Sequence, residues 1–390
     1  MRSRRLVFII LAITQVAGWG VVGVLPVLAS FIAEDLQVDL ATAFMGVTAM
    51  YAVMGLSAPV VGKAFEKLGV KHVMLCGASV IGVAFAAMAI VHSVAAYLAC
   101  WCAIGVGGAM FLTMSAYAYL AEFAGESARG MIGSLMLVTG LAGSAFWPLT
   151  AWLDHILGWR GVTQIYGGGM LLLVLPLLVL ILPDVRSTSA SPVSGRTKNR
   201  RGHILWFLVA AISLNSFVTL GMESVGIELF KALGADLTLA VGLASFMGVL
   251  KVGGRLIDVM GGQRWNAIWT GIVSGAMIPA AMLIPVVFGP SSGAIFAYMV
   301  IFGIGSGAFA VARATMPLEF YERSDYAPAM SVITLPMSLV NATAPPLLSG
   351  LMASAGPSAM LLLMVVCSAA ALCSLLALGH FKNRQRGLVA

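Results

Sequence analysis

Long apolar stretches alternate with short polar ones along the whole chain. Each apolar stretch runs for roughly 20 residues or more, which as a helix is enough to cross the hydrocarbon layer of a membrane. Backbone polar groups in lipid must be satisfied within their own segment, so these stretches predict helices. Twelve spanning helices are expected, at residues 6–32, 41–64, 73–92, 95–121, 131–155, 162–182, 204–230, 238–257, 267–288, 293–318, 328–354 and 358–380.

The amino-acid composition indicates an integral membrane protein. Of the 390 residues, 60% are hydrophobic and only 9% are charged, which is far more apolar than a soluble core of this size needs. The first apolar run is too long for the hydrophobic region of a signal peptide, which spans about 7 to 15 residues. The predicted fold class is therefore an all-α membrane protein that keeps its first helix.

The positions of the basic residues predict the orientation of the chain. If the chain starts on the inner side, twenty of its 22 Lys and Arg residues face that side, and only Arg160 and Lys231 face the other. Lys and Arg collect on the cytoplasmic side of membrane proteins. We therefore expect a multi-pass protein of the plasma (inner) membrane with both termini cytoplasmic. The net charge of +7 reflects this orientation, and no nucleic-acid partner is expected.

The longest polar stretch lies at residues 183–203 and is rich in Ser and Arg. Such a composition is typical of a flexible linker. It predicts an N-terminal six-helix bundle at residues 1–182 and a C-terminal six-helix bundle at residues 204–390, joined on the cytoplasmic side.

The two predicted halves share three landmarks in the same order. A repeat at a fixed offset is the sequence signature of duplicated units. The pairs are GKAFEKLGVK at 62–71 and GRLIDVMGGQ at 254–263, AEF at 121–123 and LEF at 318–320, and Pro148 and Pro346, with offsets of 192, 197 and 198 residues.

The repeated loop resembles the loop motif of the major facilitator superfamily, Gly-x-x-x-Asp-basic-x-Gly-basic-basic, and the likeness covers nearly the whole chain. It implies two pseudo-symmetric bundles around a central cavity that opens alternately to either side. The first copy matches at Gly62, Lys67, Gly69 and Lys71, with Glu66 in place of Asp, and the second matches at Gly254, Asp258 and Gly261, with Arg255 beside the first glycine.

The acids of this loop are candidate conformational latches. An acid in a tight turn can face the N-terminus of a neighbouring helix, where the helix dipole favours negative charge. Glu66 and Asp258 are expected to fill this role, with Arg129, Arg323 and the starts of the fifth and eleventh helices as partners. The alternative is that these are solvated loop charges that only set topology.

The seventh predicted helix carries Asn215, Thr219 and Glu223 at every fourth residue, along one stripe of the helix. Polar groups inside a membrane are costly and tend to face a cavity or a partner. A buried carboxylate can carry a proton, so Glu223 is the candidate for proton coupling. The alternative is an interfacial carboxylate near the outer end of the helix.

Arg313 is the cation that best fits an anion site, and its alternative is snorkelling to the interface. Lys251 and Arg255 are expected to snorkel or to complete the latch. The first, fourth, seventh and tenth helices line the cavity in the resembled family, which implies several lining residues. The candidate substrate-binding residues are Gln15, Trp19, Tyr51, Tyr117, Trp147, Asn215, Thr219, Arg313 and Asn341.

These features favour a secondary active transporter that moves a small organic anion by alternating access and is coupled to protons. Trp-Pro at 147–148 and LGWRG at 157–161 are similar to bacterial monocarboxylate porters. Proton-coupled drug exporters often carry an Arg where this chain has Trp101. The alternatives are proton-coupled efflux of hydrophobic drugs or metabolites, and a non-transporting sensor.

No enzyme, metal or cofactor is expected. The five His residues are scattered, the five Cys residues fall within predicted helices, and no nucleophile, phosphate-binding or metal motif is present. Asp154, His155 and Arg160 are expected to form a surface ion pair at the outer end of the fifth helix. The expected partners are a small-molecule substrate, the lipid bilayer and a proton, and the protein is expected to be a monomer.

Overall fold

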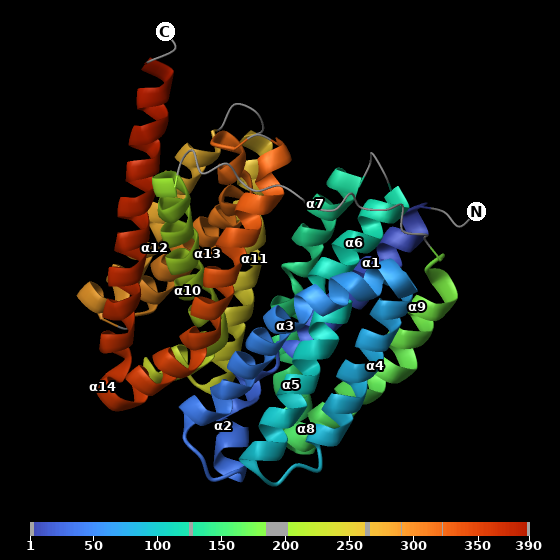
Figure 1. The fold of residues 1–390 in the computed structure, drawn as a ribbon. Helices are drawn as coiled ribbons and strands as arrows, with labels where there is room; N and C mark the ends of the chain where they lie inside the picture. The colour runs from blue at the N-terminus through green and yellow to red at the C-terminus, as the bar shows by residue number, and fades with distance from the viewer. Residues whose placement is uncertain are drawn as a thin grey trace. The chain divides into compact units, whose positions relative to one another are not determined.

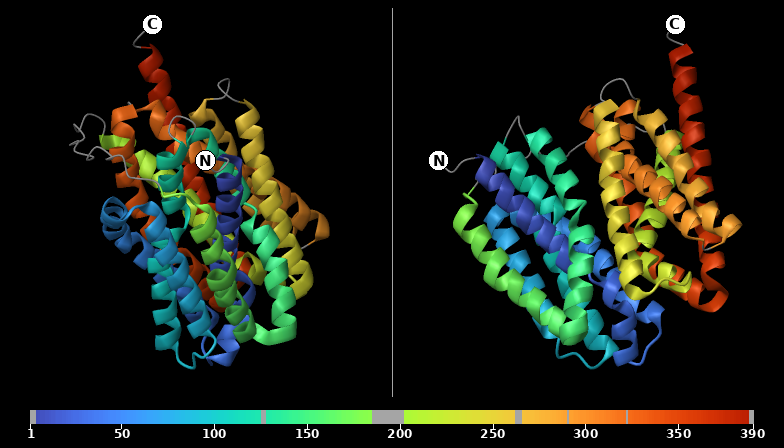
Figure 2. Two further views of the ribbon diagram at one scale, coloured as in Figure 1. Left: turned by 90° about the vertical axis from the view of Figure 1, so that its right-hand side faces the viewer. Right: turned by 180° about the vertical axis from the view of Figure 1, so that it is seen from behind.

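The computed structural model describes residues 4–124, 128–184, 202–261, 266–289, 291–321 and 323–387. Within these ranges every regular element is a helix (Figure 1), and views from the side and from behind show the same (Figure 2). The prediction of an all-α protein is confirmed. The predicted linker lies largely outside the described residues.

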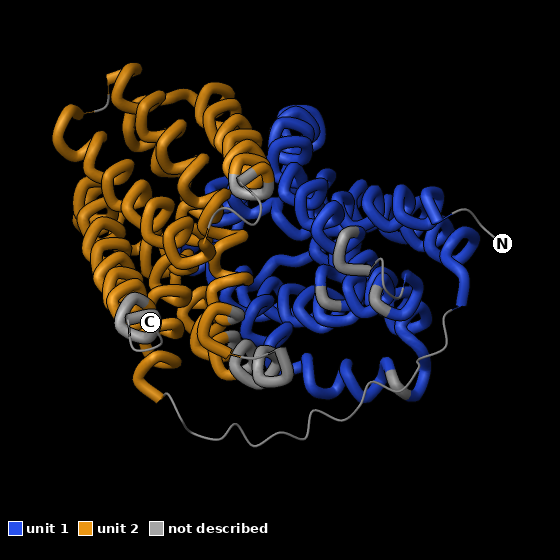
Figure 3. The backbone as a smooth tube through the Cα atoms, turned by 90° about the horizontal axis from the view of Figure 1, so that it is seen from above, with its two compact units in different colours: residues 1–191 blue, residues 192–390 orange. Residues whose placement is uncertain are grey.

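The chain divides into two compact units, unit 1 at residues 1–191 and unit 2 at residues 192–390 (Figure 3). Unit 1 contains nine α-helices and one π-helical turn, η2, among its described residues. Its elements are α1 (Arg4–Val22), α2 (Leu25–Asp35), α3 (Leu40–Leu68), α4 (Val70–Met88), α5 (Val94–Phe111), α6 (Thr113–Ala124), α7 (Ala128–Thr139), α8 (Ala142–Gly169), η2 (Met170–Val174) and α9 (Leu175–Ile181).

Unit 2 is built from longer helices and one short 3₁₀ turn, η4. Within it α10 packs against α14, and α13 packs against both α11 and α12. Its elements in the described residues are α10 (Gly202–Ala232), α11 (Leu237–Gly261), α12 (Ala267–Phe288), α13 (Ser292–Thr315), η4 (Met316–Glu319) and α14 (Arg323–Gly387).

Ten helices of the described residues are long and apolar enough to cross a membrane. Two of these spans, Met131–Ile181 and Leu335–Lys382, hold 51 and 48 residues, about twice what one crossing requires. Each is interrupted by a glycine with positive φ, Gly158 at 68° and Gly356 at 83°. Only glycine adopts this conformation without strain. Twelve crossings are compatible with these two interruptions.

Equivalent residues in the two units begin equivalent helices. Asp39 caps α3 by accepting a hydrogen bond from Thr42 N at 2.7 Å, and Asp236 caps α11 by accepting one from Leu239 N at 2.7 Å. These aspartates are 197 residues apart. A cap of this kind satisfies N–H groups that have no partner within the helix. Hydrogen bonds from Thr42 hold the pKa of the Asp39 carboxyl below its ordinary value.

The chain reversals before these caps also match. In unit 1, Val38 N donates to Ala33 O at 2.9 Å, and in unit 2 Ala235 N donates to Phe230 O at 3.0 Å. This bond is typical of a helix end whose next residue has positive φ. That residue is Gln37 in unit 1, with φ 54°, and Gly234 in unit 2, with φ 99°.

Helix packing repeats as well. A Cβ atom on Gly105 of α5 would lie 2.6 Å from Met50 O of α3. A Cβ atom on Gly303 of α13 would lie 2.6 Å from Leu250 Cβ and 3.4 Å from Met247 O of α11. Gly105 and Gly303 are 198 residues apart, and Met50 and Met247 are 197 apart. The same close helix approach is therefore built twice, as the sequence repeat predicts.

Candidate functional site

An ion pair inside the candidate spanning helices joins α10 to α11 in unit 2. Lys251 Nζ donates to Glu223 Oε1 at 2.7 Å. Lys251 is buried, whereas 45% of the Glu223 side chain is exposed. A buried lysine needs a counter-ion, because an unpaired charge away from water is costly. Glu223 provides it.

Two neighbours on α13 fix the position of Lys251. Its ammonium lies 5.5 Å from the centre of the Phe302 ring, a distance at which the ring face attracts a cation. One turn and a half further along α13, Gly307 lies directly against the Lys251 backbone, where a Cβ atom would collide with the Lys251 carbonyl. The lysine is thus held between α10, α11 and α13.

Arg313 approaches the same helix α10 from α13. Its Nη1 donates to Ser216 Oγ at 3.3 Å. Ser216 precedes Glu223 by seven residues, which is two helical turns or about 10 Å along α10. The charges of Lys251, Arg255 and Arg313 all act on the Glu223 carboxylate. We call these three cations and Glu223 the charged cluster.

The other members of the predicted α10 stripe diverge from Glu223. Asn215 is fully buried, and neither atom of its amide has a hydrogen-bond partner among the described residues. Its Nδ2 lies 3.8 Å from where a Cβ atom on Gly275 of α12 would be, so it faces the interior of unit 2. The half-buried Thr219 donates to Ser216 O at 3.2 Å. Asn341, on α14, is half-buried and its Oδ1 has no described partner.

In unit 1 three of the predicted site residues donate hydrogen bonds at the positions where helices break. Gln15 Nε2 donates to Phe111 O at 2.8 Å, at the end of α5, and Trp19 Nε1 donates to Thr113 Oγ1 at 2.9 Å, at the start of α6. Trp147 Nε1 donates to Gly23 O at 2.9 Å, between α1 and α2. A broken helix inside a membrane exposes carbonyls that side chains must satisfy.

The two remaining candidates of unit 1, Tyr51 on α3 and Tyr117 on α6, are each half-buried. The structure therefore places the candidate substrate-binding residues in two groups. Gln15, Trp19 and Trp147 join α1 to its neighbours within unit 1, while Arg313 belongs to the charged cluster of unit 2.

The predicted latch falls mostly outside the described residues. Nothing is described for the side chains of Glu66 and Asp258, nor for those of Arg129 and Arg323, their expected partners. The neighbouring positions are described. In the first copy, Gly62 lies within α3, the exposed Lys67 lies in its last turn, and Gly69 follows with φ 80°. Lys71 pairs with Asp184 at 3.2 Å. In the second copy, Gly254 packs closely against Ile304 O of α13, and Gly261 ends α11.

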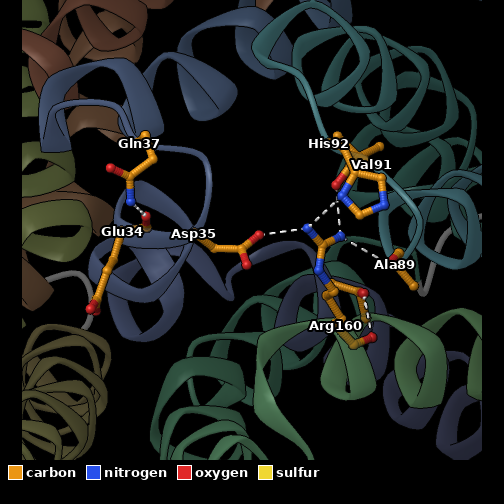
Figure 4. Close-up of polar contacts among 8 residues, drawn as sticks. Glu34, Asp35, Gln37, Ala89, Val91, His92 and Arg160 are labelled. Carbon is orange, nitrogen blue, oxygen red and sulfur yellow. Dashed lines mark hydrogen bonds and ion pairs between the residues drawn. The ribbon is translucent and has the colours of Figure 1, made fainter.

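A second polar cluster lies at the end of unit 1 where α2 stops and α5 starts (Figure 4). Arg160 Nη2 lies 2.5 Å from Asp35 Oδ2, and Nη1 donates to the carbonyls of Ala89 at 3.0 Å and Val91 at 2.7 Å. The ion pair of Arg160 is thus with Asp35 of another helix, and the expectation of a local pair with Asp154 is wrong. Arg160 ties three chain segments together.

The pairing of Lys251 with Glu223 was not predicted from the sequence. The predicted helix ended at residue 257, whereas α11 runs to Gly261, so ten residues of helix, about 15 Å, follow Lys251. The two residues are 28 apart in the chain, and only the packing of α11 against α10 brings them together.

Among the described residues, no group of three or more His, Cys, Asp or Glu side chains could hold a metal ion. The five cysteines are all free and scattered over α4, α5 and α14. The described charged cluster offers charge and hydrogen bonding for a solute.

The sequence matches the family model described as Major Facilitator Superfamily over residues 8–289, and the chain belongs to this family. It is therefore a multi-pass membrane transporter of a small molecule and not an enzyme. None of the curated proteins matches the chain significantly.

Solved transporters share the fold at low sequence identity. A bacterial homologue of the human lysosomal transporter Spinster, in an inward-facing and occupied conformation, is 17% identical with a TM-score of 0.73, and the match covers 98% of this chain and 97% of that one. The nucleoside transporter NupG is 13% identical with a TM-score of 0.75, over 96% and 100%. The human organic anion transporter MFSD10 is 16% identical with a TM-score of 0.67, over 96% and 100%.

Proposed function

We propose that this chain is a secondary active transporter of a small organic anion of the monocarboxylate type, coupled to protons and working by alternating access. The observation that carries the proposal is the charged cluster, in which the buried Lys251 bonds to Glu223 and Arg313 bonds to Ser216 of the same helix α10. Ionisable residues at such depth mark substrate or ion pathways. We further propose a monomer in the plasma membrane with both termini cytoplasmic.

Arg313 is the proposed ligand of the substrate carboxylate. A guanidinium binds a carboxylate through two parallel hydrogen bonds, which gives geometric selectivity as well as attraction. The contact with Ser216 Oγ holds the Arg313 head beside α10, two turns from Glu223. A monocarboxylate that binds there adds one negative charge to a cluster of three cations and one acid.

Glu223 is the proposed proton carrier. In the structure its carboxylate is paired with Lys251. Protonation removes the charge that holds this pair together, and the ammonium then faces the incoming anion. Proton and anion thereby favour each other's binding, which is the requirement for coupled movement in one direction.

Uptake of labelled lactate into proteoliposomes of the purified full chain tests the proposal. With an imposed inward proton gradient, the wild type is expected to accumulate lactate. Arg313→Ala is expected to reduce uptake at least about tenfold, the effect of one lost charge-assisted contact. Lys63→Ala removes an exposed basic residue of α3 and serves as the control with unchanged uptake. Normal lactate uptake by Arg313→Ala would remove Arg313 from the site.

The proton step has its own measurement. Glu223→Gln is expected to abolish accumulation driven by the pH gradient while exchange of internal for external lactate continues. Accumulation that persists in Glu223→Gln would end the proton-carrier role.

Efflux of hydrophobic drugs is the second candidate function, and Trp19 and Trp147 are aromatic side chains that such solutes would contact. Both indole N–H groups are engaged in hydrogen bonds within unit 1, at 2.9 Å each. This occupation favours the anion over the drug. Drug resistance on expression, combined with no lactate flux, would reverse that order.

A further inference from the structure

The ammonium of Lys251 contacts two groups of different chemistry. Its Nζ donates a hydrogen bond to Glu223 Oε1 at 2.7 Å and lies 5.5 Å from the centre of the Phe302 ring. A carboxylate loses its charge when it takes up a proton, whereas the negative face of a phenylalanine ring does not titrate. Phe302 is therefore the partner of Lys251 that still attracts the ammonium when Glu223 is protonated.

We propose that Phe302 is a positioning residue of the proton step, which keeps Lys251 charged and in place while Glu223 carries a proton. The proposal rests on the proposed function, since it takes Glu223 to be the proton carrier. Lys251 is buried, and an ammonium without a partner away from water is costly. If Lys251 released a proton whenever Glu223 took one up, the pair would gain none. The ring stabilises the ammonium, so that the pair holds both protons.

Close packing of α11 against α13 fixes the Phe302 ring beside Lys251. A Cβ atom on Gly307 of α13 would collide with the Lys251 carbonyl, and small residues of this kind let helix backbones approach closely inside a membrane. The Phe302 ring is fully buried and stacks on Tyr298 of the same helix, with ring centres 5.7 Å apart. The position of the ring is therefore set by the packing of the bundle.

The equivalent positions of unit 1 lack both the cation and the ring. At the offsets that relate the equivalent helices, 197 and 198 residues, Lys251 corresponds to Met54 and Phe302 corresponds to Ile104. Ile104 is fully buried, as Phe302 is. An aliphatic side chain thus fills this position where no lysine faces it, and an aromatic ring is present in the unit that carries the lysine.

Fluorination of the Phe302 ring tests the proposal. Phenylalanine that carries one or three ring fluorines, introduced at this position in the full chain, has less electron density on the ring face and nearly the same shape. The attraction of a cation depends on that electron density, so it falls while apolar packing is kept. The same substitutions at Phe309, a buried ring further along α13, are the matched control.

Thermal unfolding in detergent is the first readout. Glu223→Gln imitates the protonated acid, so in this variant the ammonium depends on the ring. Fluorination of Phe302 is expected to lower the unfolding temperature of Glu223→Gln by more than that of the wild type, in proportion to the number of fluorines. Fluorination of Phe309 is expected to act equally in both backgrounds. Equal shifts in both backgrounds at Phe302 would overturn the proposal.

The pH dependence of proton-driven lactate uptake into proteoliposomes is the second readout. Half-maximal uptake is expected at a more acidic outside pH with each added fluorine, because the doubly protonated pair is less stable and forms only at a higher proton concentration. At neutral pH, uptake is expected to fall about threefold or more with three fluorines. The charges that act on Glu223 stay in place, namely those of Lys251 and Arg255 on α11 and Arg313 on α13.

Lactate uptake by the wild type with a pH dependence that fluorination of Phe302 leaves unchanged would overturn the proposal and leave the proposed function standing. No lactate uptake by the wild type would overturn both. Equal changes of the pH dependence at Phe302 and Phe309 would assign the effect to packing and would also overturn the proposal. If Glu223→Gln does not purify as a folded protein, the pH dependence in the wild-type background decides alone.

Discussion

The two units share the contacts that build their helix bundles and differ in the charged residues that these bundles carry. Helix caps, chain reversals and close helix contacts recur at offsets of 197 or 198 residues. At those same offsets, Glu223, Lys251 and Arg313 of unit 2 correspond to Pro26, Met54 and Ser115 of unit 1. The residues that recur in both units form the helix bundle. The three charged residues of unit 2 have uncharged counterparts in unit 1.

The two units also differ in how often their helices are interrupted. Unit 1 breaks its helices between α1 and α2, between α5 and α6 and between α7 and α8, whereas α10 to α13 run without interruption through their described residues. Neutral donors such as Gln15 and Trp147 satisfy the carbonyls that the breaks expose. At these breaks unit 1 uses neutral polar side chains to satisfy its own backbone, whereas in unit 2 the unbroken helices α10 and α11 are joined by the ion pair of Glu223 and Lys251.

The largest expected effect on stability comes from replacing Lys251 of unit 2 with methionine, the residue at the equivalent position of unit 1, Met54. Lys251→Met is expected to lower the free energy of unfolding by about 2 to 3 kcal/mol, because Glu223 loses its charge-assisted hydrogen bond to Lys251. The combination with Glu223→Gln is expected to recover most of this loss, since both charges are then gone. Thermal unfolding in detergent measures both variants. Equal instability of the single and double variants would show that the pair contributes no coupling.

A smaller effect is expected in unit 1. Trp147→Phe is expected to destabilise by roughly 1 to 3 kcal/mol, because Gly23 O loses its donor at the break between α1 and α2. Trp152→Phe, at a Trp that is 60% exposed on the same helix, is the matched control and is expected to change stability little. If both variants behave alike, the indole N–H does not support the break.

The smallest effect concerns the two chain reversals. Gln37→Gly is expected to stabilise the protein by about 1 kcal/mol or less, because Gln37 adopts a positive φ that glycine tolerates better. Gly234→Gln, the reciprocal change at the equivalent position of unit 2, is expected to destabilise by a similar amount. Shifts of the same sign in both variants would contradict the equivalence of the two reversals.

Much of the scaffold is predictable from the sequence, because spanning helices are fixed by length and apolarity alone. The segment predicted at 267–288 coincides with α12. The positive-φ glycines Gly158 and Gly356 are 198 residues apart, the same offset as Pro148 and Pro346, although these interruptions were not predicted from the sequence. The break between α5 and α6 at Leu112 was not predictable, because no proline or polar run marks it. It depends on Gln15, which lies nearly a hundred residues away.

The candidate site was only partly predictable, for a geometric reason. Residues four apart on a helix are offset by about 40°, so Asn215 and Glu223, eight apart, point about 80° from each other. Asn215 consequently faces α12 while Glu223 faces Lys251. Periodicity identifies the polar helix, and only the packing of neighbouring helices decides which of its side chains act together.

Calorimetric titration of lactate into the purified protein tests most directly whether the charged cluster of unit 2 is an anion site. The wild type and Lys63→Ala are expected to bind lactate with the same affinity, and Arg313→Ala is expected to bind it at least about tenfold more weakly. Equal lactate affinity in all three proteins would contradict the account and place the anion elsewhere.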